Sequence, residues 1–259
     1  MRSSVVLLLV AAAAALPACG TSRGASAVSV ATVTPTPVPT GSATPTPTPG
    51  TDVPLRFIAI GDTGTGEAGQ IAVANAIANK CAAEACDFGV LLGDNFYPSG
   101  VSSATDPNFD VMFQQIYGTM GFPFYVVLGN HDYGVNGAGT QFDIGAYEVE
   151  YGLQHDNWKL PGEYYAFENS HATFLGLGTD LIFWDHNGAI AEQGQYFAAA
   201  LTASTKPWRI SMGHHPYFSN GTHGNAGSYD GIPWLPVANG ENVKTFFDGY
   251  LCGKVDLFL

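Results

Sequence analysis

Short apolar runs alternate with polar clusters that contain glycine along the chain from residue 53 onward. A buried strand that feeds a loop has this pattern, because the apolar run ends where the backbone turns. Four runs fit best, and each is followed by its own polar cluster: 55–60 before GDTG, 88–92 before GDNFY, 124–128 before GNHD, and 209–212 before GHHP. The pattern therefore predicts four strands with polar residues at their carboxyl ends.

Helical periodicity separates some of these strands. Residues 67–80 place Ile71, Ala74, Ile77 and Ala78 on one face of a helix. Further helices are predicted at 109–117 and 192–203, and an antiparallel hairpin joins 164–167 to 172–177. The mixture predicts an α/β fold. In an open sheet the loops at the carboxyl ends of the strands form the ligand crevice, so the four polar clusters are expected to converge.

Size and charge narrow the class of protein. The chain has 259 residues, of which 46% are hydrophobic, which is enough for one sizeable domain. Only 9 Lys and Arg stand against 22 Asp and Glu, and a net charge of -13 repels nucleic acid. We therefore expect no nucleic-acid partner. An anionic substrate would need a strong local positive charge, such as bound metal ions.

The first 52 residues have the composition of an exported leader and a linker. Arg2 precedes an apolar core at 5–16 that is too short for a membrane-spanning helix, which predicts a signal peptide over 1–19. The sequence before Cys19 resembles a bacterial lipobox, in which the cysteine is lipidated and tethers the protein to a membrane. The alternative is an ordinary cleaved signal, and both interpretations place the protein outside the cytoplasm. Residues 20–52 are rich in Thr and Pro and predict a disordered linker before a catalytic domain at 53–259.

The remaining cysteines do not have the spacing of a zinc site. An oxidising compartment would allow Cys81 and Cys86 to close a small loop at a helix end, which would leave Cys252 over if Cys19 is lipidated. The alternative is that all three are small buried residues.

The polar clusters supply oxygen and nitrogen donors that suit hard or borderline metal ions. Taken in order, GDTG, GDNFY, GNHD and GHHP resemble the motifs of the metallophosphoesterases, and the tyrosine of GDNFY resembles that of the purple acid phosphatases. The resemblance covers the chain from residue 53 onward. It implies an αββα sandwich of two mixed sheets flanked by helices.

The resemblance also implies a dinuclear metal centre. Asp62 and Tyr97 would bind the first ion, Asp94 would bridge both, and Asn130 and His214 would bind the second. A phenolate ligand favours Fe(3+), and its partner in the family is Fe(2+), Zn(2+) or Mn(2+). A bridging carboxylate offsets the repulsion between the two cations. The simpler alternatives are turn or helix-capping roles for the Asp and Asn residues and core packing for Tyr97.

The implied reaction is hydrolysis of a small phosphate ester or a phosphoprotein by a metal-bound hydroxide. His131 and His223 match the histidines of the family that contact phosphate and protonate the leaving oxygen, so they are the catalytic candidates. His215 stands where the family commonly has tyrosine and is left unassigned.

The next motif of the family, GHxH, supplies one further histidine to each metal. Here the sequence ends at 255–259, in an apolar strand without its loop, so we expect a partial catalytic domain with both metal sites one histidine short. The alternatives to an acid phosphatase are a metallophosphodiesterase or nucleotidase with the same core, and a non-catalytic tethered binding module.

Overall fold

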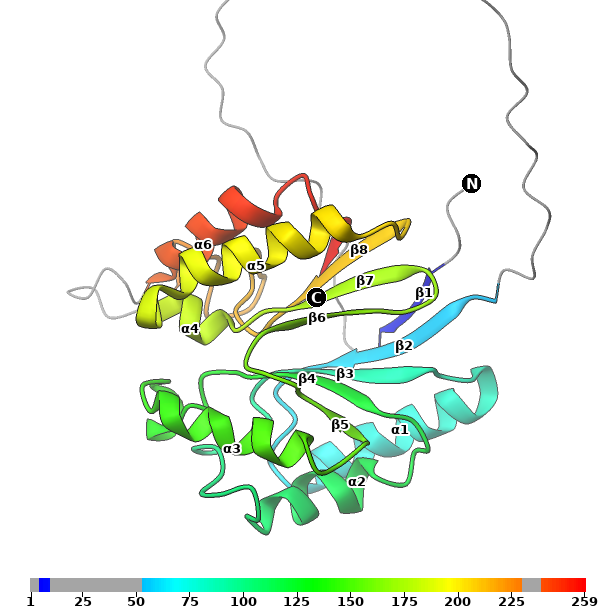
Figure 1. Cartoon of the computed structure of the whole chain (residues 1–259). Coiled ribbons are helices and arrows are strands. Elements are labelled where there is room, and N and C mark those ends of the chain that lie inside the picture. Colours follow the sequence, from blue (N-terminus) through cyan, green and yellow to red (C-terminus); the bar gives the residue numbers. More distant parts are fainter. Residues whose placement is uncertain (1–4, 10–52, 230–238) are drawn as a thin grey trace, which may run out of the picture.

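The structure of the chain is a computed structural model that describes residues 53–229 and 239–259, together with the backbone of residues 5–9. The predicted linker and nearly all of the predicted signal peptide lie outside these ranges. Within them the chain forms two sheets, with helices on the outer face of each (Figure 1). This layered architecture confirms the predicted αββα sandwich.

The first sheet is wholly parallel among the described residues. Its strands follow the order β1 (Val5–Leu9), β2 (Leu55–Ile60), β3 (Phe88–Leu92), β4 (Phe124–Val127) and β5 (Trp158–Lys159). Helical segments connect β2, β3, β4 and β5 in turn, and such crossovers keep neighbouring strands parallel. The carboxyl ends of β2, β3 and β4 therefore lie along the same edge.

The second sheet is mixed. Its strands follow the order β6 (Tyr165–Glu168), β7 (Ala172–Gly176), β8 (Trp208–Met212) and β9 (Leu257–Phe258). The pair β6 and β7 is the predicted antiparallel hairpin, whereas β8 is parallel to both β7 and β9. The carboxyl end of β8 is where GHHP begins.

Aromatic side chains fill the space between the two sheets. Phe174 of β7 meets the rings of Phe57 and Phe88 edge-on, each at 5.4 Å between centroids. Tyr125 of β4 stacks on Phe167 of β6 at 3.6 Å. Burial of large rings contributes strongly to stability, and the edge-on geometry adds a smaller term. This aromatic layer fixes the two sheets face to face.

Helices cover the outer faces of both sheets (Figure 1). The first sheet is covered by α1 (Ala68–Glu84), the π-helical η1 (Phe109–Gln114), α2 (Gln115–Tyr117) and α3 (Phe142–Gly152). The second sheet is covered by α4 (Thr179–Trp184), α5 (Ala189–Ala203), α6 (Glu241–Phe246) and the π-helical η5 (Phe247–Leu251). Short 3-10 turns form η2 (Val135–Gly137) and η3 (His186–Gly188).

Helix α1 buries a different face from the predicted one. Ala74 and Ile77 are buried as expected, but Ile71 is 46% exposed and Ala78 is exposed as well. Gln70 is buried on this helix instead. Its side-chain amide accepts a hydrogen bond from Gly66 N and donates one to the carbonyl of Met112. These two bonds satisfy a buried polar side chain that an apolar pattern cannot reveal.

Of the two alternatives that the sequence left open for Cys81 and Cys86, the structure has the disulfide, which closes the loop at the end of α1 with the Cα atoms 5.1 Å apart. Cys252 is also disulfide-bonded, so the expectation that it is left over was wrong.

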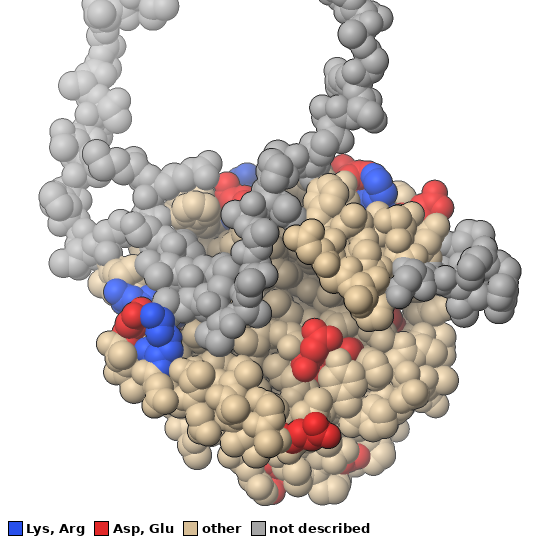
Figure 2. Space-filling view, turned by 180° about the vertical axis from the view of Figure 1, so that it is seen from behind, with Lys and Arg blue, Asp and Glu red and all other residues tan. Residues whose placement is uncertain are grey.

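No helix in the described ranges has the length and apolar character to cross a membrane. Charged side chains are sparse on the face of the molecule that Figure 2 presents.

Candidate metal centre

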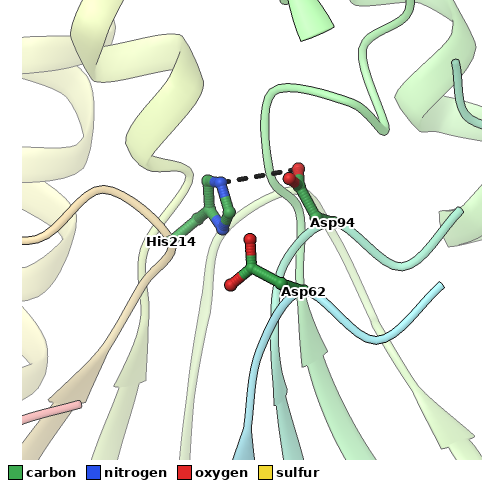
Figure 3. Close-up of side chains that lie close together, drawn as sticks. All are labelled: Asp62, Asp94 and His214. Atoms are coloured by element: carbon green, nitrogen blue, oxygen red, sulfur yellow. Dashed lines mark ion pairs between the residues drawn. The ribbon is translucent and has the colours of Figure 1, made fainter. Parts of the chain in front are cut away.

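Three ligand-type side chains from both sheets meet at one end of the sandwich. Asp62 follows β2, Asp94 follows β3 and His214 follows β8 (Figure 3). One potential ligand atom of each lies within 4.8 Å of those of the other two. His214 Nε2 is 3.4 Å from Asp94 Oδ1. The structure therefore brings together residues that are up to 152 positions apart in the sequence.

The backbone around the two aspartates adopts an uncommon conformation. Asp62 and Asp94 have φ angles of 56° and 55°, in the left-handed region that residues with side chains rarely occupy. Asp62 N donates to the carbonyl of Gly93, and Gly64 N donates to that of Asp94, so the two loops support each other. A Cβ at Gly93 would lie 2.8 Å from the ring of His214. Such strain is typical of functional sites.

Tyr97 lies against both aspartates. Its hydroxyl oxygen is 2.7 Å from Asp94 Oδ2 and 3.0 Å from Asp62 Oδ1. Burial raises the pKa of Tyr97 far above its ordinary value, and the neighbouring Asp94 and Asp62 raise it further. The metal-free phenol is therefore protonated, and coordination as a phenolate would release that proton.

The lone pairs of Asn130 and His214 face each other. His214 Nδ1 lies 3.0 Å from the carbonyl oxygen of Leu92, which can only accept, so this nitrogen carries the hydrogen. Asn130 Nδ2 donates to the carbonyl of Gly137 at 2.7 Å, which turns Asn130 Oδ1 toward His214 Nε2 at 2.9 Å. In the neutral imidazole both atoms are acceptors, and only a cation or a proton relieves their repulsion. The donor set therefore fits a metal ion.

His131 stands beside the same group. Its backbone N donates to Asp94 Oδ1 at 3.0 Å, and its Nδ1 donates to the carbonyl of Pro98 at 2.8 Å. The ring packs on Tyr97 at 4.4 Å between centroids, and Nε2 lies 4.0 Å from Asp94 Oδ2. The Nδ1 bond leaves Nε2 free to meet a substrate.

Asp132 is a supporting residue that belongs to the donor set of the predicted loops but was not among the assigned metal ligands. It is fully buried and accepts hydrogen bonds from the backbone N of Gly129, Asn95 and Phe96 and from the side chain of Asn95, over 2.8–3.0 Å. These bonds tie the loop of Asp94 to the loop that carries Asn130 and His131. Asn95 lies within GDNFY and Asp132 within GNHD, so their positions in these motifs could have indicated that both residues support the centre.

The centre holds an excess of buried acid. Burial and the nearby Asp94 raise the pKa of Asp132 to about 7. Burial also raises the pKa values of Glu148 and Asp180 well above their ordinary range, and neither residue had a sequence signal. No Lys or Arg side chain bonds to these acids in the described part of the chain. The raised pKa values favour the protonated, uncharged forms of these acids, and bound cations would favour their ionised forms.

The other predicted histidines lie differently. His215 packs on Phe183 and pairs its Nδ1 with the hydroxyl of Thr179 at 3.1 Å, while burial lowers its pKa, so it shapes the protein interior. Thr179, which the sequence gave no reason to select, also accepts from the backbone N of His214. His223 is exposed in the loop after His214 and is not grouped with Asp62, Asp94 and His214. Its catalytic role stays a prediction.

A sandwich of two sheets whose strand ends bring carboxylates and imidazoles together is the architecture of the metallophosphoesterases. The model of the calcineurin-like phosphoesterases matches residues 55–251, and the chain belongs to this family. The resemblance stated from the motifs is thereby confirmed.

The chain is also similar in sequence to named acid phosphatases. The chain is 26% identical over 198 residues to tartrate-resistant acid phosphatase type 5 of Rattus norvegicus, which covers 66% of this chain and 58% of that protein. It is 28% identical over 225 residues to purple acid phosphatase 3 of Arabidopsis thaliana, covering 77% and 58%. The chain thus spans less than two thirds of the length of both relatives.

One solved structure supports the fold. GAP50, the anchor in the inner membrane complex of Plasmodium, superposes with a TM-score of 0.55 at 24% identity, over 79% of this chain and 64% of that one.

Proposed function

We propose that this chain carries the core of an exported acid phosphatase that hydrolyses phosphate monoesters at a dinuclear metal centre. One observation carries the proposal: three atoms of types that bind metal ions, His214 Nε2, Asn130 Oδ1 and Asp94 Oδ1, converge, with His214 Nε2 2.9 Å from Asn130 Oδ1 and 3.4 Å from Asp94 Oδ1. The named acid phosphatase relatives favour this activity over others of the family.

Each residue of the centre has a distinct part in the proposal. Asp62 and Tyr97 would hold the first ion, Asn130 and His214 would hold the second, and Asp94 would contribute to both. When bound, the ions supply Lewis acidity and lower the pKa of water. A phenolate from Tyr97 suits Fe(3+), with Fe(2+), Zn(2+) or Mn(2+) as its partner.

His131 acts on the substrate in this proposal. Its Nδ1 hydrogen is held by the carbonyl of Pro98, so Nε2 faces the centre and can contact a phosphoryl oxygen or hold the proton for the leaving oxygen. His223 is assigned to the same step on its motif spacing. The substrate is a small phosphate ester or a phosphoprotein, and the composition of the leader supports a location outside the cytoplasm.

Kinetics on paired esters test the proposed activity. We expect kcat/KM for an aryl phosphate monoester to exceed that for the matching diester by at least about tenfold, because a dianion is held by two cations more strongly than a monoanion. His131→Gln should lower kcat/KM for the monoester by about a hundredfold, a typical loss for a positioned acid or base.

His155→Gln is the matched control, since His155 is exposed and stacks on Tyr151 outside the centre, so its activity should equal that of the wild type. Faster hydrolysis of the diester would show instead a phosphodiesterase, and full activity in His131→Gln would remove this histidine from the mechanism.

A further inference from the structure

Residues 134–137 form a strained turn in the loop that follows GNHD, and the turn includes η2. Their four φ angles are all positive, between 52° and 87°. Two of the residues are glycine, but Val135 is β-branched, and a positive φ is a genuine outlier for such a residue. Strain of this kind persists only where the surrounding structure holds it, and it clusters at functional sites.

Hydrogen bonds fix the strained turn to two loops of the candidate metal centre. Gly134 N donates to the carbonyl of His131 at 2.9 Å, within the loop that carries GNHD. Asn136 N donates to Ser99 Oγ at 2.8 Å, in the loop that follows GDNFY. Gly137 N closes the turn by donating to the carbonyl of Gly134 at 3.2 Å. Both loops therefore hold the turn in a fixed position beside the centre.

The carbonyl of Gly137 determines which atom Asn130 presents to the centre. A carboxamide has an oxygen that accepts and a nitrogen that donates, and only the oxygen can bind a cation. Gly137 O accepts from Asn130 Nδ2 at 2.7 Å, which leaves Asn130 Oδ1 2.9 Å from His214 Nε2. Loss of this acceptor would let the amide rotate and turn its nitrogen toward the ion.

The missing side chain of Gly137 leaves room for His131. A Cβ at position 137 would lie 2.5 Å from His131 Nε2 and 2.7 Å from its Cε1, which is too close for any side chain. The ring has little freedom to retreat, because Nδ1 bonds to the carbonyl of Pro98 and the ring packs on Tyr97. A side chain at position 137 would therefore displace the ring, and with it the Nε2 atom assigned to the substrate.

We propose that Gly137 is a positioning residue with two effects: its carbonyl presents the oxygen of Asn130 to the second ion, and its lack of a side chain keeps His131 Nε2 in place for the substrate. The inference rests on the proposed function for the ion and the substrate, neither of which Gly137 would touch. The strain at Val135 is the consequence of holding residue 137 in this position.

Gly137→Ala tests the space around His131 in the metal-free protein. Gly121→Ala is the matched control, because Gly121 has a similar φ of 78° and a Cβ there would meet nothing within 4 Å. Both variants therefore carry a similar backbone cost, and only Gly137→Ala meets the ring. Nuclear Overhauser contacts between the rings of His131 and Tyr97 should persist in the control and disappear in Gly137→Ala. Their persistence in both variants would overturn the role of Gly137.

Ser99→Ala tests the carbonyl of Gly137 without changing that residue, and it keeps the proposal testable if Gly137→Ala does not fold. It removes the hydroxyl that holds the turn, so exchange of the Asn130 side-chain amide protons with solvent should be at least about threefold faster than in the wild type. Ser103→Ala is the matched control, since Ser103 Oγ accepts a backbone N–H from Thr105 in an exposed hydrogen bond. Equal exchange in Ser99→Ala and the control would contradict the orientation of Asn130 by the turn.

Kinetics separate this role from the proposed function. In the protein whose reading frame is extended past Leu259, Gly137→Ala should lower kcat/KM for an aryl phosphate monoester by about a hundredfold, as expected for His131→Gln, while Gly121→Ala retains wild-type activity. Loss of the ring contacts in Gly137→Ala, without hydrolysis of any ester by the wild type, would reject the phosphatase and retain the positioning role. Equal activity in Gly137→Ala and Gly121→Ala would reject the positioning role and retain the phosphatase.

Discussion

Replacing Asp94 by asparagine is expected to remove at least one metal ion per chain and to lower kcat/KM by at least about 1,000-fold. Asp94 is 3% exposed, and its two oxygens lie 2.7 Å from the Tyr97 hydroxyl and 3.4 Å from His214 Nε2. It is therefore placed to hold both ions. The amide has the same shape but lacks the charge that offsets their repulsion, and the lost Lewis acidity is worth several kcal/mol.

Metal analysis and steady-state kinetics on the same preparation would measure this effect. Asp110→Asn is the matched control, because Asp110 is an exposed residue of η1 that bonds to Gln115 on the surface. It should retain its metal and activity. An Asp94→Asn protein with two tightly bound ions would show that Asp94 is not the bridging ligand.

Asp132→Ala is expected to reduce the free energy of unfolding by about 3–5 kcal/mol. The substitution removes the acceptor for the backbone N–H groups of Gly129, Asn95 and Phe96, and water does not reach this buried position to replace it. Each buried donor left without a partner costs about 1–3 kcal/mol. Denaturant unfolding of the metal-free protein would measure the loss without the contribution of bound metal.

Asp106→Ala controls for the number of hydrogen bonds. Asp106 also accepts several, from Ser102 N, Ser102 Oγ and Asn108 N, but in a turn near the surface where water can take its place. We expect this variant to lose about 1 kcal/mol or less. Equal losses in the two variants would mean that Asp132 does not hold the two loops together.

The part of the fold that the sequence predicted well depends on local pattern. Strands β2 and β3 begin and end at the predicted residues, because each is a continuous apolar run between polar residues. Their parallel arrangement then places the following motifs at one edge. For this reason the positions of Asp62, Asp94, Tyr97, Asn130 and His214 could be anticipated without coordinates.

The part that the sequence did not predict depends on long-range packing. Helix α4 has only six residues, and α3 buries Glu148, a residue type that normally marks a solvent-facing position. The burial of Glu148 and Asp180 follows from contacts across the fold rather than from their neighbours in sequence. The interior role of His215 is similar, since Thr179 and Phe183 lie more than 30 positions away.

The most direct test of the dinuclear proposal is metal analysis of the purified protein together with its visible absorption spectrum. When the reading frame is extended past Leu259 so that each site gains its expected histidine, we predict two metal ions per chain, one of them iron, and a broad visible band that disappears in Tyr97→Phe, because the phenolate of Tyr97 is the proposed ferric ligand. A colourless extended protein that binds no metal, or a band that persists in Tyr97→Phe, would contradict the proposed centre.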